Sequence, residues 1–504
     1  MKFIKQFLYL NFLILGFYIL NSNSLDIDYS KFQSPLSGRY ASDEMSYLFS
    51  PQNKYSSWRK VWVALAKSEK DLGLNISDEQ IEELNNHLED IDFNAAAKYE
   101  KELKHDVMAH IHAYADQCPK AAPIIHLGAT SCLITDNADI VVIRDALQVL
   151  KKRLILLIKQ LSENAMKYKD VSCLAFTHFQ SAQPTTVGKR MTLWIQDFLF
   201  DLNDLNYRLE RLQFLGLKGA TGTQASFLKL FDGDHEKVKA LEKKFAEYLN
   251  SKFVVPVSGQ TYSRKQDIQI LDVLAGVATS AHKMATDIRL LAHLKEVEEP
   301  FAKNQVGSSA MPYKRNPMKC ERICGLSRLV IAGSENPKYT AATQWFERTL
   351  DDSSNRRFSI SETFLLVDSI LNLLIDITDG IVVYPKVIEN HLNKEIPFFI
   401  TENVLMEGVK KGGDRQKLHE KIRQHSVYVS NKIKNEGIEK NNLLDLIVED
   451  SEIPLEDKDI EKIVDVKNLI GRAPEQVEEF IENYINPICA NLENSYLDKV
   501  AIDI

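Results

Sequence analysis

Apolar residues recur along this chain at alternating steps of three and four, which is the spacing of one face of an α-helix. Stripes of this kind run through residues 143–161, 270–291 and 362–379. They are longer than an average globular helix and have the period of bundle packing. Alternation typical of strands is scarce; residues 253–257 are the best candidate, and Pro256 weakens it. The pattern predicts an all-α fold with a core of long bundled helices, part of whose apolar surface is buried between subunits.

Breaks in this pattern divide the chain into three parts. A Leu-Gly-Ala-Thr-Ser segment over residues 127–131 separates shorter helices from the long bundle, and the third stripe ends at Gly380. A chain of 504 residues is also too long for a single core. We therefore expect an N-terminal helical domain over 25–130, a central long-helix bundle over 131–383 and a C-terminal helical domain over 384–504.

The first residues resemble a targeting signal. Two lysines precede an apolar run over residues 7–20, and two serines follow where a signal peptide would be cleaved. The run is short for a membrane span, and six cysteines without Cys-x-x-Cys spacing suit a reducing compartment. We expect a cytoplasmic protein whose residues 1–24 form a signal-like or unstructured extension, with secretory targeting or an anchor as the alternative.

Composition narrows the function classes only slightly. A hydrophobic content of 44% and a charged content of 26% are ordinary for a globular protein. The formal net charge of −8 gives no reason to expect nucleic acid as a general partner. Any binding of anions must therefore come from local groups of cations.

One segment after the second stripe, residues 307–317, combines a Gly-Ser-Ser start with two prolines, Lys314, Arg315 and Asn316. Each proline fixes its own φ and biases its predecessor toward extended geometry, while glycine admits unusual backbone angles. This composition predicts a structured loop whose donors and cations face an anion. The string resembles the Gly-Ser-Ser-x-Met-Pro-x-Lys-x-Asn-Pro loop of the fumarase/aspartase superfamily, whose members eliminate fumarate from substituted succinates.

Such an elimination needs three kinds of group. A base removes a weakly acidic C–H proton, cations stabilise the carboxylate into which the carbanion resonates, and an acid protonates the leaving nitrogen. A serine serves as base only if its alkoxide is stabilised. Ser308, beside loop amides and Lys314, fits that role, and Lys314 and Asn316 would hold the carboxylate as its charge grows.

A histidine suits the acid, because its pKa lies near working pH. Among the twelve histidines, His178 lies in a polar, proline-ended stretch between helical segments, and His105 is flanked by charged residues. A metal site at His105, His110 and His112 is disfavoured, because spacings of five and two do not bring the side chains onto one helix face. We expect no metal and no cofactor.

Further segments of the chain resemble one particular family within this superfamily. In order along residues 30–490, the chain is similar to the adenylosuccinate lyase family of the animal type, within the same superfamily. The matching segments are residues 34–40, 104–110, 125–131, 218–226, 344–353 and 471–474.

The resemblance implies roles for individual residues. The catalytic group would contain His178 as general acid, Ser308 as general base, Glu321 as the partner of His178, and His105. Arg39 and Tyr40 would bind the phosphate end of the substrate, helped by Lys104, His105 and Asp106. The other substrate-binding positions would be Thr130, Ser131, Gln260, Lys314, Asn316, Arg322, Arg348, Ser353 and Arg357. Lys104 replaces the arginine usual in animal enzymes, so it keeps the charge but loses the bidentate fork.

The implied activity is elimination of fumarate from adenylosuccinate to give AMP, and from the ribotide SAICAR to give AICAR, in purine nucleotide biosynthesis. The implied assembly is a homotetramer whose active sites draw on three subunits, with no nucleic acid and no stable membrane association. One alternative is another fumarate-releasing lyase, such as argininosuccinate lyase or fumarase, which needs no phosphate pocket. A second is a non-enzymatic scaffold of the kind found among lens crystallins. Hydrolase and oxidoreductase interpretations lack a nucleophile elbow or a dinucleotide glycine loop.

Overall fold

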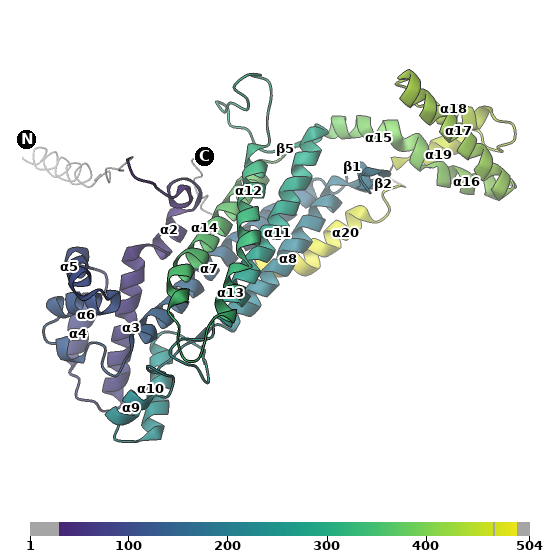
Figure 1. The fold of residues 1–504 in the computed structure, drawn as a ribbon. Coiled ribbons are helices and arrows are strands. Elements are labelled where there is room, and N and C mark those ends of the chain that lie inside the picture. The colour runs from purple at the N-terminus through teal and green to yellow at the C-terminus, as the bar shows by residue number, and fades with distance from the viewer. Residues whose placement is uncertain (1–29, 467–468, 491–504) are drawn as a thin grey trace, which may run out of the picture.

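A computed structural model describes residues 30–466 and 469–490 of the chain. The molecule is elongated, with short helices at one end, long parallel and antiparallel helices in the middle, and a small helical cluster at the other end (Figure 1). The prediction of a mostly helical fold is confirmed. The predicted extension over residues 1–24 lies outside the described residues.

The N-terminal helices begin at side chains that cap them. Ser42, Ser50, Ser77 and Asp92 each accept a hydrogen bond from a backbone N–H in the first turn of the following helix. Ser77 and Gln80 form a reciprocal capping box, in which the side chain of each accepts the backbone N–H of the other. The elements are η1 (Leu36–Tyr40), α2 (Asp43–Leu48), α3 (Pro51–Asp71), α4 (Asp78–Asn86), α5 (Phe93–Leu103), α6 (Asp106–Gln117) and η2 (Ala122–Ile124).

The three apolar stripes all lie within long central helices. Residues 143–161 belong to α7 and residues 270–291 to α11, and the stripe positions in both are buried. The third helix begins eleven residues before residue 362, because its first turns are polar and carry no apolar stripe. The central helices are α7 (Ser131–Lys167), α8 (Val187–Glu210), α11 (Lys265–His293), α12 (Met318–Gly333) and α14 (Asp351–Gly380).

Among the described residues, three short two-stranded sheets interrupt the helices. The strand predicted over residues 253–257 forms only at β4 (Phe253–Val254), which pairs in parallel with β3 (Gln213–Phe214). The hairpin of β1 (Ser172–Thr177) and β2 (Gln180–Thr186) was not expected, because the second strand is polar and contains a proline. The third sheet joins β5 (Val297–Glu298) to β6 (Val382–Val383).

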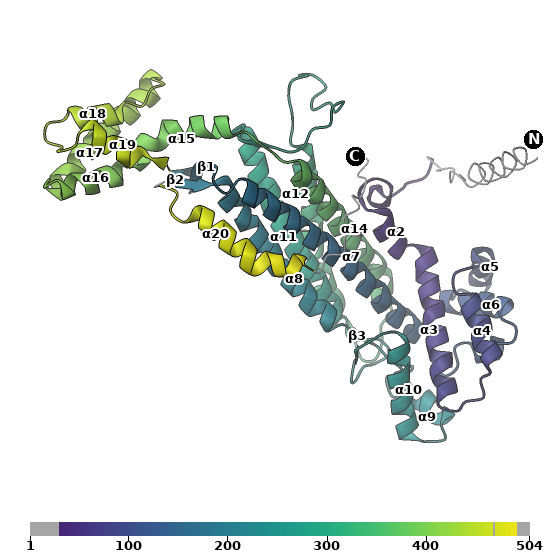
Figure 2. The same cartoon turned by 180° about the vertical axis from the view of Figure 1, so that it is seen from behind.

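The C-terminal helices leave the bundle and then return to it. Helices α15 to α19 enclose their own apolar core, and α20 lies back along α8 (Figure 2). The three-domain division stays a prediction. The remaining helices are α9 (Ala225–Leu230), α10 (His235–Tyr248), α13 (Asn336–Ala342), α15 (Pro385–Phe399), α16 (Thr401–Lys410), α17 (Arg415–Glu436), α18 (Leu443–Glu449), α19 (Asp457–Val464), α20 (Ala473–Phe480), η4 (Ile481–Ile485) and α21 (Asn486–Cys489).

Helix α14 is, within the described residues, the one helix long and apolar enough to cross a membrane by length and composition. Most of its apolar stretch is buried inside the fold, where it packs on α7, α11 and α12. The central helix of a globular bundle has the same properties, so this observation is weak evidence for a membrane span.

Candidate active site

A cavity of about 850 Å³ lies where the N-terminal helices meet the bundle. Its walls come from the start of α3, the junction of α5 and α6, the start of α7, the segment before α11 and the first turns of α14. Much of the predicted substrate-binding set lines this cavity. These residues are Lys104, His105, Asp106, Thr130, Ser131, Gln260, Arg348, Ser353 and Arg357.

His105 is held by the helix that it starts. Lys104 ends α5 in the left-handed region, with φ of 54°, and His105 is the N-cap of α6. The His105 Nδ1 accepts the backbone N–H of Met108 at 3.3 Å, and its Nε2 lies 3.4 Å from the Ser131 hydroxyl. A neutral imidazole has one donor and one acceptor, so the capping bond assigns the proton to Nε2. His105 therefore faces the cavity with an N–H.

The other two histidines of the disfavoured metal set lie in different surroundings. His110 is buried and stacks on Tyr55 with ring centres 3.7 Å apart, and His112 stacks on Tyr99. Burial, with help from Arg59, lowers the pKa of His110 to about 4. No group of three metal-ligating side chains occurs among the described residues.

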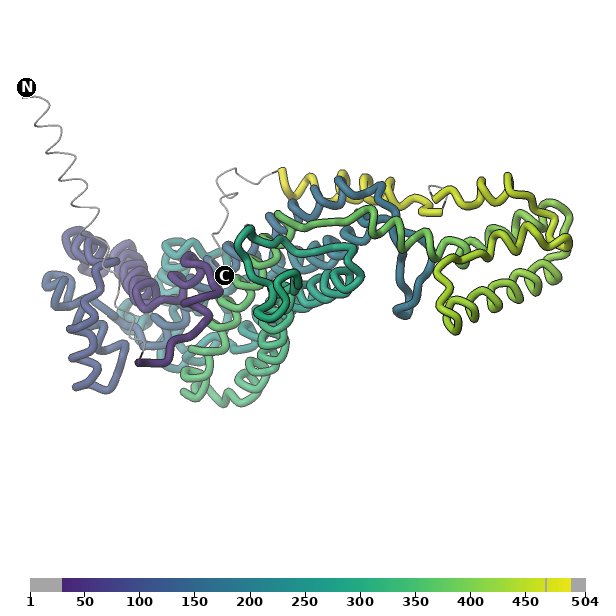
Figure 3. The backbone as a smooth tube through the Cα atoms, turned by 90° about the horizontal axis from the view of Figure 1, so that it is seen from above, coloured from purple at the N-terminus to yellow at the C-terminus, as the bar shows by residue number. Residues whose placement is uncertain are grey.

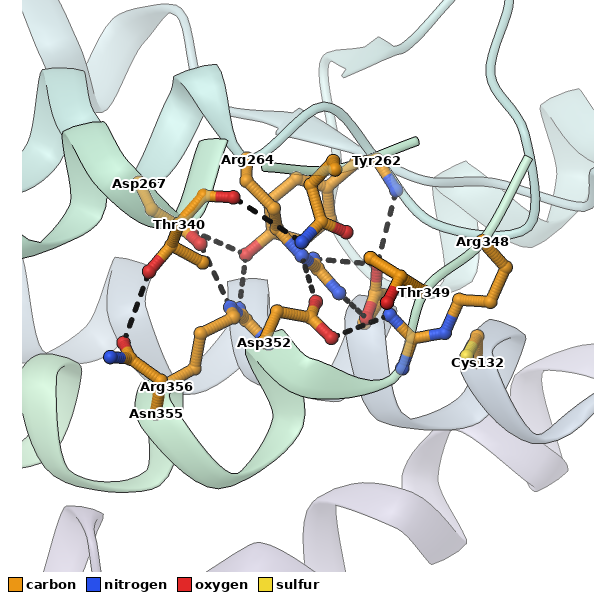
Figure 4. Close-up of polar contacts among 12 residues, drawn as sticks. Cys132, Tyr262, Arg264, Asp267, Thr340, Arg348, Thr349, Asp352, Asn355 and Arg356 are labelled. Carbon is orange, nitrogen blue, oxygen red and sulfur yellow. Dashed lines mark hydrogen bonds and ion pairs between the residues drawn. The ribbon is translucent and has the colours of Figure 1, made fainter. Parts of the chain in front are cut away.

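The floor of the cavity is a buried network of charges (Figure 4). The Arg264 guanidinium donates to both oxygens of Asp136, at 2.9 and 3.1 Å, and to Asp352 at 2.6 Å. Asp352 is fully buried and accepts a second hydrogen bond from Arg348 at 2.7 Å. The network thus fixes the guanidinium of Arg348, one of the predicted substrate-binding groups. Asp352 serves here as an anchor that the sequence analysis did not single out.

A second arginine extends this network. Arg356 donates to Asp267 at 2.8 Å, to Asp139 at 2.9 Å and to the Tyr262 hydroxyl at 2.5 Å. Tyr262 in turn donates to Asp267 at 2.7 Å. Burial alone would raise the pKa of Asp352, but Arg264 outweighs it together with the other arginines and holds that pKa below its usual range. Asp352 therefore remains ionised, whereas burial raises the pKa of Asp139 against the opposing effect of Arg356.

The charged residues of this buried network follow a pattern that can be recognised in the sequence. Asp136 and Asp139 lie one turn apart at the start of the long apolar helix α7, and Asp352 and Arg356 have the same relation in α14. Charged residues rarely occupy buried positions unless they are paired. Opposite charges within two long helices could therefore have been recognised as a buried ion network.

The 307–317 loop lies at the other end of the bundle, between β5 and α12 (Figure 1). The Ser308 hydroxyl accepts the backbone N–H groups of Ala310 at 3.4 Å and Met311 at 3.2 Å. The Asn316 amide donates to the Gly307 carbonyl at 2.8 Å and closes the neck of the loop. Lys314 is exposed. The expectation of a structured loop with amides around Ser308 agrees with this geometry.

Two glutamates hold the base of this loop. Both carboxylate oxygens of the buried Glu299 accept backbone N–H groups at the start of α12, from Lys319 and Cys320 at 3.0 Å each. Glu298 accepts from Tyr384 at 2.8 Å and pairs with Arg315 of the loop at 3.4 Å. Helix α12 then carries the predicted site residues Glu321, which is exposed, and Arg322, which is half-buried.

His178 lies at the tip of the β1–β2 hairpin, which projects from the bundle as a blue loop in Figure 3. It forms the two-residue turn with Phe179, and both have left-handed φ angles, 52° and 58°. Such turns usually contain asparagine or glycine, so two bulky residues here hold a strained conformation. Both side chains are exposed. Within the described chain, His178 makes no hydrogen bond or ion pair with Glu321.

Arg39 and Tyr40 lie apart from the cavity, in the single turn η1. This turn packs on α14, and the nearby Ser42 backbone N–H donates to Asp368 at 2.7 Å. Asp368 follows Ser353 by fifteen residues, which is about 22 Å along a helix. The chain thus carries its predicted site residues in separate places: the cavity, the 307–317 loop with α12, the hairpin tip and η1.

The comparisons with known proteins identify the fold first. Residues 39–332 match a family profile described as "Lyase". A fumarate lyase from Mesorhizobium sp. BNC1 superposes with a TM-score of 0.75 at 22% identity, covering 88% of this chain and 99% of that chain. A 3-carboxy-cis,cis-muconate lactonizing enzyme from Pseudomonas putida superposes with a TM-score of 0.77 at 22% identity, covering 89% and 98%. The class is therefore the helical lyase fold predicted from the stripes and the loop.

Proteins of similar sequence show which family within this class the chain belongs to. The adenylosuccinate lyase of Saccharomyces cerevisiae is 50% identical over 462 residues, covering 91% of this chain and 96% of the relative. That of Schistosoma mansoni is 44% identical over 479 residues, covering 94% and 98%. Residues 397–480 also match a profile described as "Adenylosuccinate lyase C-terminus". The chain belongs to the adenylosuccinate lyase family.

Proposed function

We propose that this protein eliminates fumarate from adenylosuccinate to give AMP, and from SAICAR to give AICAR. The observation that carries the proposal is the convergence of Arg348, Arg357, Lys104 and His105 on one cavity, in a chain of this family. A substrate with a phosphate and two carboxylates needs several cations, and the cavity supplies them although the protein is acidic overall.

The chemistry proposed for the loop follows from its hydrogen bonds. Ser308 removes the C–H proton, and the two N–H groups that its hydroxyl accepts would stabilise the alkoxide. Lys314 and the second N–H of the Asn316 amide hold the carboxylate that gains charge. His178, oriented by Glu321, protonates the departing nitrogen. These roles require the loop, the hairpin and the cavity to meet.

We propose that they meet between subunits of a homotetramer. The Ser353 and Gly380 ends of α14 are about 40 Å apart, and Gly380 packs on Pro300 near the loop. Three exposed apolar residues of α8, Leu193, Phe200 and Tyr207, follow each other at intervals of seven. This is the spacing of a helix–helix interface. Light scattering should give four times the subunit mass, and a monomer that retains full activity would contradict the shared site.

The decisive assay is fumarate release by the purified protein. Adenylosuccinate, SAICAR and argininosuccinate are compared at equal concentration, and fumarate is measured directly. We expect release from the first two and none from argininosuccinate. Release from argininosuccinate alone would favour the alternative lyase, and no release from adenylosuccinate would refute the proposal.

We also propose a cytoplasmic location. The six cysteines show no disulfide, and five of them are buried. A tagged full-length chain and one that begins at Leu25 should show the same distribution in cells. A secreted or membrane-bound full-length chain would support the targeting alternative for residues 1–24.

A further inference from the structure

The cavity contains a lysine that belongs to none of the motifs described above. Lys54 lies at the start of α3, and its side chain lines the cavity together with Leu48 and Trp58. The Lys54 ammonium lies 5.2 Å from the ring centre of Tyr55 and 5.1 Å from that of Trp58. Aromatic faces attract cations, so these two rings hold the ammonium at the cavity wall without neutralising it.

Lys54 differs from the arginines of the cavity in lacking a carboxylate partner. Arg348 pairs with Asp352 at 2.7 Å and Arg357 with Asp106 at 3.2 Å, and the two arginines of the buried network are paired as well. Among the described residues, the Lys54 ammonium makes no ion pair and no hydrogen bond. The Lys54 ammonium is therefore held in position, and its charge remains available to a ligand.

The surroundings of Lys54 disfavour its charge. Burial lowers the pKa of Lys54, and the positive charge of Arg357 lowers it further. Asp139, Asp106 and Glu100 act in the opposite direction without contacting it. An anion bound between Lys54 and Arg357 would remove this cost, because it would neutralise both cations.

We propose that Lys54 binds the phosphate of the substrate and selects a nucleotide over the corresponding nucleoside. The inference rests on the proposed function. Phosphate is favoured over a carboxylate because the family resemblance assigns the phosphate end of the substrate to the segment of residues 104–106. Lys54 lines the same cavity as this segment, and its electrostatic neighbour Arg357 pairs with Asp106 at 3.2 Å. Lys104 presents a point charge where an arginine would present a fork. Lys54 supplies a second point charge on the same anion.

The test compares two substrates that differ only in the phosphate: adenylosuccinate and its dephosphorylated nucleoside. Lys54→Met keeps the aliphatic stem and removes the charge, and Lys54→Arg restores the charge. We expect Lys54→Met to lower kcat/KM for adenylosuccinate by about 10- to 100-fold, mainly through KM, as for the loss of one hydrogen bond to a charged group. The value for the nucleoside should change by less than about twofold, and Lys54→Arg should recover part of the loss.

The matched control is Lys67→Met in the same helix. Lys67 is half-buried and lies 5.9 Å from the ring centre of Tyr248, but its ammonium donates to Asn85 outside the cavity. This variant should leave both substrates unaffected. An equal loss on both substrates for Lys54→Met, or no loss on either, would overturn the inference. Wild-type protein that releases no fumarate from adenylosuccinate would instead refute the proposed function.

Discussion

The chemistry proposed for Ser308 depends on two backbone N–H groups that already point at its hydroxyl. Because Ser309 is its exposed neighbour in the same loop, the two serines form a matched pair for mutation. Ser308→Ala should lower kcat for adenylosuccinate by about 10²- to 10⁴-fold, the usual contribution of a general base, with little change in KM. Ser309→Ala should stay near wild type. Steady-state kinetics of fumarate release measures both. A Ser308→Ala variant within a few-fold of wild type would reject serine as the base.

A second prediction for a single residue concerns a buried carboxyl group, which should make the free energy of unfolding depend on pH. Glu69 in α3 is fully buried, and neither of its carboxylate oxygens has a partner among the described residues. Burial raises the pKa of Glu69 to about 9. In the unfolded chain the Glu69 carboxyl group has the ordinary glutamate pKa of roughly 4.3. Below that pH the group is protonated in both the folded and the unfolded protein. Between that value and 9 only the unfolded state releases the proton, so folding stability falls as pH rises.

The variant Glu69→Gln removes this titration. Relative to Glu69→Gln, wild type should lose about 1.4 kcal/mol of unfolding free energy per pH unit between pH 6 and 8.5. Urea unfolding of both proteins at several pH values measures the difference. Glu82→Gln, at an exposed position of α4, provides the control for replacing a glutamate by glutamine at the surface. A constant difference for Glu69→Gln would show that the buried carboxyl group does not control this slope.

At the scale of elements, the predictable part of the fold follows from how each element is stabilised. Helices α7, α11 and α14 bury continuous apolar stripes, and such stripes are visible in the sequence. The β1–β2 hairpin is held by backbone pairing and carries polar residues with Pro184 in its second strand. Its turn at His178 uses left-handed angles without glycine. Neither property gives a periodic pattern in the sequence, so the hairpin that carries His178 was not predicted.

The 307–317 loop allows a test of how an element holds the proposed catalytic groups in place. A Cβ atom on Gly307 would lie 2.3 Å from the Lys314 carbonyl, so alanine must open the neck that Asn316 closes. Gly307→Ala should reduce kcat at least tenfold while the melting temperature changes by no more than a few degrees, since the loop lies outside the core. Gly333→Ala, at a position with open space, should change neither. Unchanged kcat in Gly307→Ala would show that the loop tolerates a wider neck.

At the scale of the whole molecule, motifs in the sequence indicated candidate site residues but not the groups that support them. Arg348 was proposed from a motif, whereas its ion-pair partner Asp352 was not singled out, because a buried ion pair depends on which helices face each other. The grouping of Lys104, Ser131 and Arg348 in one cavity required the structure. The distance from that cavity to the 307–317 loop follows from the length of α14, which a rigid helix cannot shorten.

The separate positions of His178 on the hairpin and Ser308 in the loop lead to a prediction about mixed assemblies. If each site takes His178 from one subunit and Ser308 from another, His178→Ala and Ser308→Ala homotetramers each lack one group at every site. Mixed tetramers, made by dissociating and reassembling the two variants together, will contain some sites with both groups intact. Fumarate release should therefore reappear in the mixture at a measurable fraction of the wild-type rate, although each parent is nearly inactive. The double variant His178→Ala/Ser308→Ala, mixed with wild type under the same conditions, controls for exchange between subunits. Exchange without recovery of activity in the single-variant mixture would mean that both groups act within one chain.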